Sequence, residues 1–169
     1  MEKEDGTIDY IVNALDIPCW YYLIVGALLF LSRIITKRWT ISILVSYMFF
    51  VLTLTVFVRK PGLIANYELL PFWSYVEFVR KKNMTLLLQI VANVALFIPI
   101  GALLYRLVLF RAILLGLLFS LSIEIAQYIT QRGLFEIDDI YHNTLGVIVG
   151  VISCYFITRL RVALNEPKK

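Results

Sequence analysis

The sequence predicts an all-α fold, a polytopic membrane helical bundle of about five transmembrane helices with an interfacial segment. Two observations lead to this class. Apolar residues make up 60% of the 169 residues and charged residues only 17%, whereas soluble domains average about 45–50% apolar and about 25% charged. Several apolar runs also approach the roughly 20 residues that a helix needs to cross a hydrocarbon core about 30 Å thick. At this length we expect one structural unit.

Short polar or basic links separate the predicted spans, with one exception. The long link Arg59–Asn83 contains the run Leu69-Leu-Pro-Phe-Trp-Ser-Tyr75. Because Trp and Tyr favour the headgroup level of a bilayer, we predict a half-buried segment there, a short helix lying on the membrane. Residues 1–58 then hold an acidic head and the first two spans, and residues 59–169 hold the interfacial loop and the last three. The predicted spans are Ile17–Ile35, Thr40–Val58, Met84–Leu104, Ala112–Thr130 and Ile140–Leu160.

The basic residues predict how the chain is oriented. Nine Lys and Arg residues fall in the links and the tail on one side of the predicted membrane, and seven fall on the other side. The positive-inside rule then places the carboxyl terminus inside and the amino terminus outside. Because these residues lie in short clusters between apolar runs, we expect them to orient a membrane protein, and we expect no nucleic-acid partner.

Polar residues within the fourth predicted span form one stripe. Glu124 is followed by Gln127 and Gln131 and preceded by Ser120, and these positions share a helical face. A carboxylate that faced lipid would be costly, so this face should point into the bundle. Glu124 is therefore the main candidate for a functional group at depth.

The start of the fifth predicted span carries a second stripe. Asp139, Asn143, Gly146 and Gly150 recur at steps of three and four residues. The glycines form a small-xxx-small pair, which lets two helix backbones approach closely. Asp138 and Asp139 lie at the amino end of the helix, where the backbone N–H groups and the helix dipole favour carboxylates.

The two stripes are expected to converge. A short link makes the fourth and fifth spans antiparallel neighbours, so both stripes lie at a similar depth and predict a polar pocket that opens outward. Asn93 on the third span adds a further amide. Simple hydrogen bonding between helices is the alternative explanation, and an oxygen-rich metal site around His142 is another; we assign neither metal nor cofactor. The candidate ligand-binding residues are Asn93, Glu124, Gln127, Asp138, Asp139 and Asn143, and Glu124 and Asp139 are also the candidates for catalysis.

Four sequence elements in order resemble the VanZ family of bacterial membrane proteins. They are Asn66 followed by Leu70-Pro-Phe72; Asn93-Val-Ala-Leu-Phe-Ile-Pro-Ile-Gly101; Ser120-Leu-Ser-Ile-Glu-Ile-Ala-Gln127; and Asp138-Asp-Ile-Tyr-His-Asn-Thr-Leu-Gly146. Their order and spacing match from about Arg59 to Ile157. The resemblance implies a multi-pass protein of the bacterial cytoplasmic membrane and, as a phenotype, lowered susceptibility to teicoplanin.

Three functions follow as hypotheses. The first is an envelope protein whose outward pocket binds a membrane lipid, a lipid-linked cell-wall precursor or a lipoglycopeptide antibiotic, and so lowers the access of lipophilic glycopeptides to their targets. The second is an intramembrane enzyme that modifies a lipid or a lipid-linked intermediate. The sequence contains no HExxH motif and no Ser-His-Asp order, so we expect binding rather than catalysis. The third is a transporter of a small amphiphile, although no inverted repeat is visible.

Overall fold

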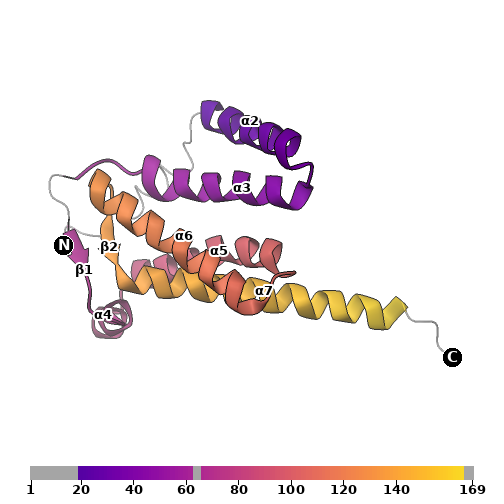
Figure 1. The fold of residues 1–169 in the computed structure, drawn as a ribbon. Helices are drawn as coiled ribbons and strands as arrows, with labels where there is room; N and C mark the ends of the chain where they lie inside the picture. The colour runs from indigo at the N-terminus through magenta and orange to yellow at the C-terminus, as the bar shows by residue number, and fades with distance from the viewer. Residues whose placement is uncertain (1–18, 63–65, 166–169) are drawn as a thin grey trace.

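Long apolar helices account for most of the chain (Figure 1). The computed structural model describes residues 19–62 and 66–165. Within these residues four helices are long and apolar enough to cross a membrane, and a fifth apolar helix is shorter, which confirms the predicted bundle of about five. The four long spans are Trp39–Phe57, Met84–Leu104 (α5), Leu109–Thr130 (α6) and Ile137–Asn165 (α7).

The first two helices form a hairpin. Helix α2 (Cys19–Thr36) is followed by α3 (Trp39–Leu52), which continues into a π-helical turn, η1 (Thr53–Phe57). Figure 1 shows this hairpin lying along one side of the bundle of α5, α6 and α7. The predicted acidic head lies outside the described residues.

Helix α7 is longer than its apolar run predicts. The predicted span ran from Ile140 to Leu160, whereas the helix runs from Ile137 to Asn165. At 1.5 Å per residue its 29 residues extend ~43 Å, so its carboxyl end projects beyond the other helices (Figure 1). Polar residues at both ends of α7 interrupt the apolar pattern, but the helical backbone hydrogen bonds continue through these residues.

A small sheet that the sequence did not predict closes one end of the bundle. Strand β1 (Asn66–Glu68) pairs in parallel with β2 (Leu134–Glu136), in a register that sets Tyr67 opposite Phe135. The predicted interfacial helix follows β1 as α4 (Trp73–Lys81), and its amphipathic sequence leaves Val76 and Val79 exposed. The link before the third span is therefore ordered by contacts with the link before the fifth.

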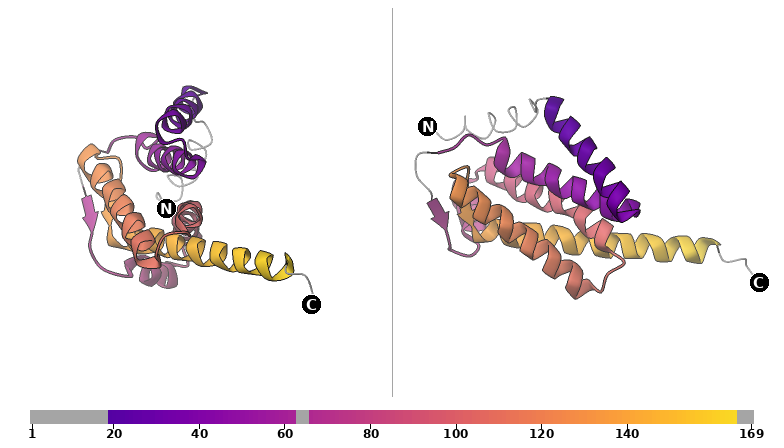
Figure 2. Two further views of the ribbon diagram at one scale, coloured as in Figure 1. Left: turned by 45° about the vertical axis from the view of Figure 1, so that its right-hand side comes forward. Right: turned by 45° about the horizontal axis from the view of Figure 1, so that its top comes forward.

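Glycines on α7 allow it to pack closely against α5. A Cβ atom added at Gly146 would lie 2.3 Å from the Val94 carbonyl oxygen, and one added at Gly150 would lie 2.1 Å from that of Ile98. Both distances are far below van der Waals contact, so the prediction that these glycines serve packing is confirmed. The views in Figure 2 agree in placing α5 beside α7.

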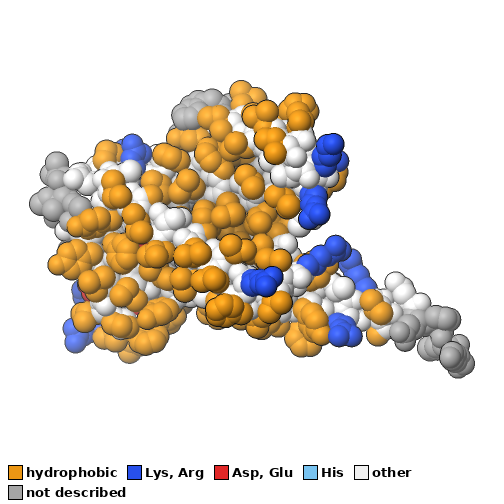
Figure 3. Space-filling model, in the orientation of Figure 1, with side chains coloured by type: hydrophobic (Ala, Val, Ile, Leu, Met, Phe, Trp, Pro, Cys, Tyr) orange, Lys and Arg blue, Asp and Glu red, His pale blue; other side chains and the backbone are white. Residues whose placement is uncertain are grey.

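The surface suits a lipid environment. Figure 3 shows hydrophobic side chains over most of one face, with Lys and Arg gathered toward the ends of the helices. The buried core is small and lies between α3, α5, α6 and α7. Polar side chains are buried beside it, and these define the candidate site.

Candidate functional site

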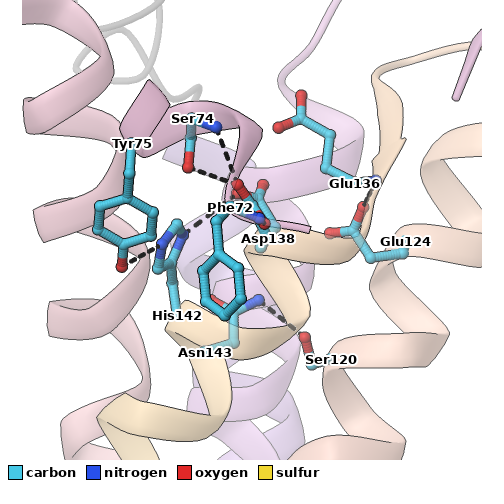
Figure 4. Close-up of polar contacts among 10 residues, drawn as sticks. Phe72, Ser74, Tyr75, Ser120, Glu124, Glu136, Asp138, His142 and Asn143 are labelled. Carbon is cyan, nitrogen blue, oxygen red and sulfur yellow. Dashed lines mark hydrogen bonds and ion pairs between the residues drawn. The ribbon is translucent and has the colours of Figure 1, made fainter. Parts of the chain in front are cut away.

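Buried polar side chains gather where α6 ends and α7 begins (Figure 4). They come from α4, from α6 and from the first turns of α7. The α2–α3 link and the α5–α6 link lie at the opposite end of the bundle (Figure 1). The buried polar residues that α4, α6 and α7 contribute at this end are Ser74, Ser120, Glu124, Gln127, Asp138, His142 and Asn143.

Asp138 fixes α4 against α7. Its carboxylate accepts hydrogen bonds from the backbone N–H of Phe72 at 2.6 Å, from the backbone N–H of Ser74 at 3.0 Å and from the Ser74 hydroxyl at 2.6 Å. The first N–H groups of a helix have no partner within it, so Asp138 caps α4 from a neighbouring helix. These bonds also hold Phe72 in a left-handed backbone conformation, φ 63°, that is costly for a residue with a side chain. Asp138 lies in the first turn of α7, as predicted, but its carboxylate binds α4.

Glu124 is shielded from lipid. Its side chain is 1% exposed, and its Oε2 accepts a hydrogen bond from the backbone N–H of Glu136 at 2.9 Å. Since Glu136 belongs to β2, the small sheet supplies the donor that this buried carboxylate needs. Asp139 repels the Glu124 carboxylate and Arg59 attracts it, so both residues lie within electrostatic reach of Glu124. The structure thus brings together Glu124 and Asp139, which the sequence predicted to converge.

Gln127 joins α6 to the π-helical turn. Its Nε2 donates to the Thr55 carbonyl oxygen at 2.9 Å. A π-helical turn displaces the regular hydrogen-bond ladder, so carbonyl groups there can take outside donors. Arg132 binds the same region: its Nη1 donates to the carbonyl oxygens of Phe57 at 2.8 Å and Arg59 at 2.9 Å. A side chain from the last turn of α6 and one from the link that follows it therefore cap the end of the second span.

Asn143 connects α7 to α6. Its Nδ2 donates to the Ser120 hydroxyl at 2.9 Å, and both side chains are buried. This contact pairs the two polar stripes that the sequence predicted.

Asn93 is different: it is half-buried on α5 and makes no hydrogen bond to these groups within the described parts of the chain. Its neighbour Val94 faces α7 at Gly146, one turn deeper than Asn143.

His142 has a partner that sequence reasoning missed. Its Nε2 lies 2.9 Å from the Tyr75 hydroxyl, and the two rings pack edge to face with centroids 5.4 Å apart. Its Nδ1 lies 3.8 Å from Asp139 Oδ1 and has no hydrogen-bond partner among the described residues. The ring is 2% exposed, whereas Tyr75 is 41% exposed. The signal for Tyr75 was its aromatic segment, but nothing local linked it to a residue 67 positions away.

Negative charge dominates the electrostatics of the site. Burial and, to a smaller extent, the nearby Asp139 raise the pKa of the Glu136 carboxyl to about 8, while Arg59 acts in the opposite direction. Asp138 and Glu68 also raise it. Burial, with a smaller contribution from Asp138, raises the pKa of the Tyr75 hydroxyl. Three other carboxyl groups and Arg59 therefore lie within electrostatic reach of Glu136.

The geometry limits what the cluster can bind. No group of three or more His, Cys, Asp and Glu side chains in the described ranges has the arrangement to hold a metal ion. Asp139 is a partly accessible carboxylate, with its side chain 18% exposed. The preceding residue, Asp138, is bound to Ser74 at the start of α4, as Figure 4 shows. The cluster can accept hydrogen bonds and attract positive charge from one side.

Fold and site together define a polytopic membrane protein, a helical bundle with a buried carboxylate-and-amide cluster at one end. A family model described as VanZ/LLP1 matches residues 19–158, which is most of the chain. The chain belongs to this family. Neither curated proteins nor solved structures gave a match.

The match corrects one boundary from the sequence analysis. We expected the family region to begin at about Arg59, but it begins at residue 19 and includes the α2–α3 hairpin. The structure gives a reason, since Thr55 at the end of that hairpin binds Gln127 of the site. The first two spans are therefore part of the unit that forms the cluster.

Proposed function

We propose that this protein lies in the bacterial cytoplasmic membrane and lowers susceptibility to lipophilic glycopeptides of the teicoplanin type. In this proposal the polar cluster faces outward and binds the headgroup of an amphiphile, which is a membrane lipid, a lipid-linked cell-wall precursor or the drug itself. Occupancy of that site reduces the access of the drug to its target. The orientation follows the distribution of basic residues, with the amino terminus outside and the carboxyl terminus inside.

One observation carries this proposal. Glu124 is almost completely buried and yet lies within electrostatic reach of the accessible Asp139. Buried ionisable groups within a membrane bundle are costly and are usually functional. Most of the other buried polar groups here are used in helix contacts, whereas Asp139 makes no hydrogen bond within the described residues and so can take a ligand.

Drug susceptibility tests the proposal. A strain lacking the protein is complemented with the wild-type chain, with Glu124→Gln or with Asp139→Asn, and membrane insertion is checked in each case. We expect both variants to lose protection against an acylated glycopeptide, and none of the strains to differ toward a glycopeptide without an acyl chain. Glu77→Gln on α4, whose carboxylate pairs with Lys81 outside the cluster, is the matched control. Full protection by both cluster variants would refute the proposal.

A second candidate function is intramembrane acid–base catalysis on a lipid. The observation that favours it is the chain of contacts from Asp139 through His142 to the Tyr75 hydroxyl. A histidine between a carboxylate and a hydroxyl is able to move a proton between them. Purified protein incubated with labelled lipid extracts should then form a product that Tyr75→Phe and His142→Gln both abolish. Without such a product the catalytic alternative is rejected, while the binding proposal remains.

A further inference from the structure

A groove on α4 lies next to the acidic cluster. It is lined by Tyr75, Val76, Val79 and Arg80. Tyr75 joins the two features, because its ring lines the groove and its hydroxyl binds His142, whose Nδ1 faces Asp139. The groove therefore offers an apolar wall with a cationic end, and the cluster beside it offers negative charge.

Two carboxyl groups of the cluster accept no hydrogen bond within the described part of the chain. Neither the Asp139 carboxylate nor the Glu136 carboxyl accepts a hydrogen bond from any described residue. The buried Nδ1 of His142 also lacks a hydrogen-bond partner there and is directed at Asp139, 3.8 Å away. The Asp139 carboxylate is partly exposed and can therefore accept hydrogen bonds from a ligand. A ligand group with several N–H donors and a positive charge suits this position, whereas a phosphate would meet repulsion.

The groove supplies the complementary charge, because Arg80 lines the same groove as Tyr75, whose hydroxyl binds His142. Arg80 follows Ser74 by six residues, or ~9 Å along the helix axis. Ser74 is bound to Asp138, the immediate neighbour of Asp139. We place the anionic group of an ammonium-bearing headgroup on Arg80, because Arg80 is the cationic side chain that lines the groove. Val76 and Val79 then provide an apolar surface for an acyl chain.

We propose that the occupant of this site is a phospholipid whose headgroup carries a primary ammonium. The ammonium binds Asp139, with the carboxyl groups of Glu136 and Glu124 nearby. The phosphate binds Arg80, and one acyl chain lies along Val76 and Val79. This inference rests on the proposed headgroup-binding function and names the chemical class of the headgroup.

Competitive lipid binding tests this assignment. The full chain, purified in a neutral maltoside detergent, is mixed with equal amounts of phosphatidylethanolamine and phosphatidylglycerol, and the bound lipid is counted by native mass spectrometry. We expect phosphatidylethanolamine to be preferred about tenfold, as for a charge-assisted hydrogen bond in a partly buried site. The preference should be lost in Asp139→Asn, binding of both lipids should weaken in Arg80→Gln, and Glu77→Gln should behave as wild type.

Soluble competitors separate the two ends of the headgroup. Phosphoethanolamine should displace the bound lipid at lower concentration than ethanolamine, and Arg80→Gln should remove that difference. Equal competition by the two compounds in the wild type would overturn the assignment of the phosphate to Arg80. Equal or preferred binding of phosphatidylglycerol that still depends on Asp139 would overturn the ammonium class but leave headgroup binding standing. Failure of both lipids to bind would reject the phospholipid assignment, while the susceptibility test would still decide the proposed function. Arg80 is exposed, so Arg80→Gln should fold normally. Its effect on lipid binding therefore still tests the assignment if Asp139→Asn does not fold.

Discussion

Replacing Asp138 with alanine tests how the site is held together. The side chain is 1% exposed and accepts three hydrogen bonds, two of them from backbone N–H groups at the start of α4. Hydrogen bonds to a charged group contribute about 1.5–3 kcal/mol each. Water near the membrane surface can replace some of these hydrogen bonds. We therefore expect the free energy that holds α4 in place to fall by about 3–5 kcal/mol, comparable to breaking a buried ion pair. The left-handed conformation of Phe72 loses its support at the same time.

Hydrogen exchange measures this loss where it occurs. In Asp138→Ala the amides of Phe72 and Ser74 should exchange about 10²–10³-fold faster than in the wild type, since each 1.4 kcal/mol corresponds to a factor of ten. Ser74→Ala removes only the hydroxyl bond and should have a much smaller effect. Glu77→Ala, which breaks a partly exposed pair with Lys81, should change the exchange little. If the peptide that contains Phe72 and Ser74 exchanged at the wild-type rate in Asp138→Ala, the capping role would be wrong.

Three further predictions concern packing, titration and the contact between the stripes. Gly150→Ala should destabilise the bundle by about 1–3 kcal/mol in unfolding by sodium dodecyl sulfate, because the new Cβ would lie 2.1 Å from the Ile98 carbonyl oxygen; unchanged unfolding would mean that α5 and α7 are not packed this closely. For Glu136 the raised pKa of about 8 means that its contribution to stability is complete below pH ~4.5 and is lost as the pH rises to about 8, a change on the order of 5 kcal/mol. Glu136→Gln should therefore flatten the decrease in melting temperature over this range, and parallel pH profiles for variant and wild type would contradict the burial of this carboxyl. Asn143→Ala should cost about 1–2 kcal/mol in the same detergent unfolding, since it leaves the buried Ser120 hydroxyl without its donor.

Local patterns in the sequence were sufficient to predict the helices. The length and polarity of each apolar run give the spans, because a bilayer imposes both. The meeting of Glu124 with the start of α7 was also predictable, since a short link makes those two helices neighbours. The small-residue pair Gly146 and Gly150 indicated a close helix contact and identified the face of α7 that makes it.

Contacts between distant segments could not be predicted in the same way. Strands of three residues have too few positions to show an alternating pattern, so the pairing of Asn66–Glu68 with Leu134–Glu136 left no local signal. The same is true of Asp138, whose place at the start of α7 was clear although its carboxylate binds a helix 64 residues earlier in the chain. His142 had no visible partner in the sequence because Tyr75 is contributed by that same distant helix.

The first two turns of α7 explain why these long-range contacts belong to one site. Asp138 holds the amino end of α4, and His142, one turn further along α7, holds Tyr75 on the same helix. Asp139 lies between these two attachments and remains accessible. Two fixed points on a helix of nine residues leave it little freedom to rotate or slide, so the α4 groove keeps its position relative to Asp139. A ligand that bridges them meets a preorganised pair of charges and binds without the cost of ordering the loop.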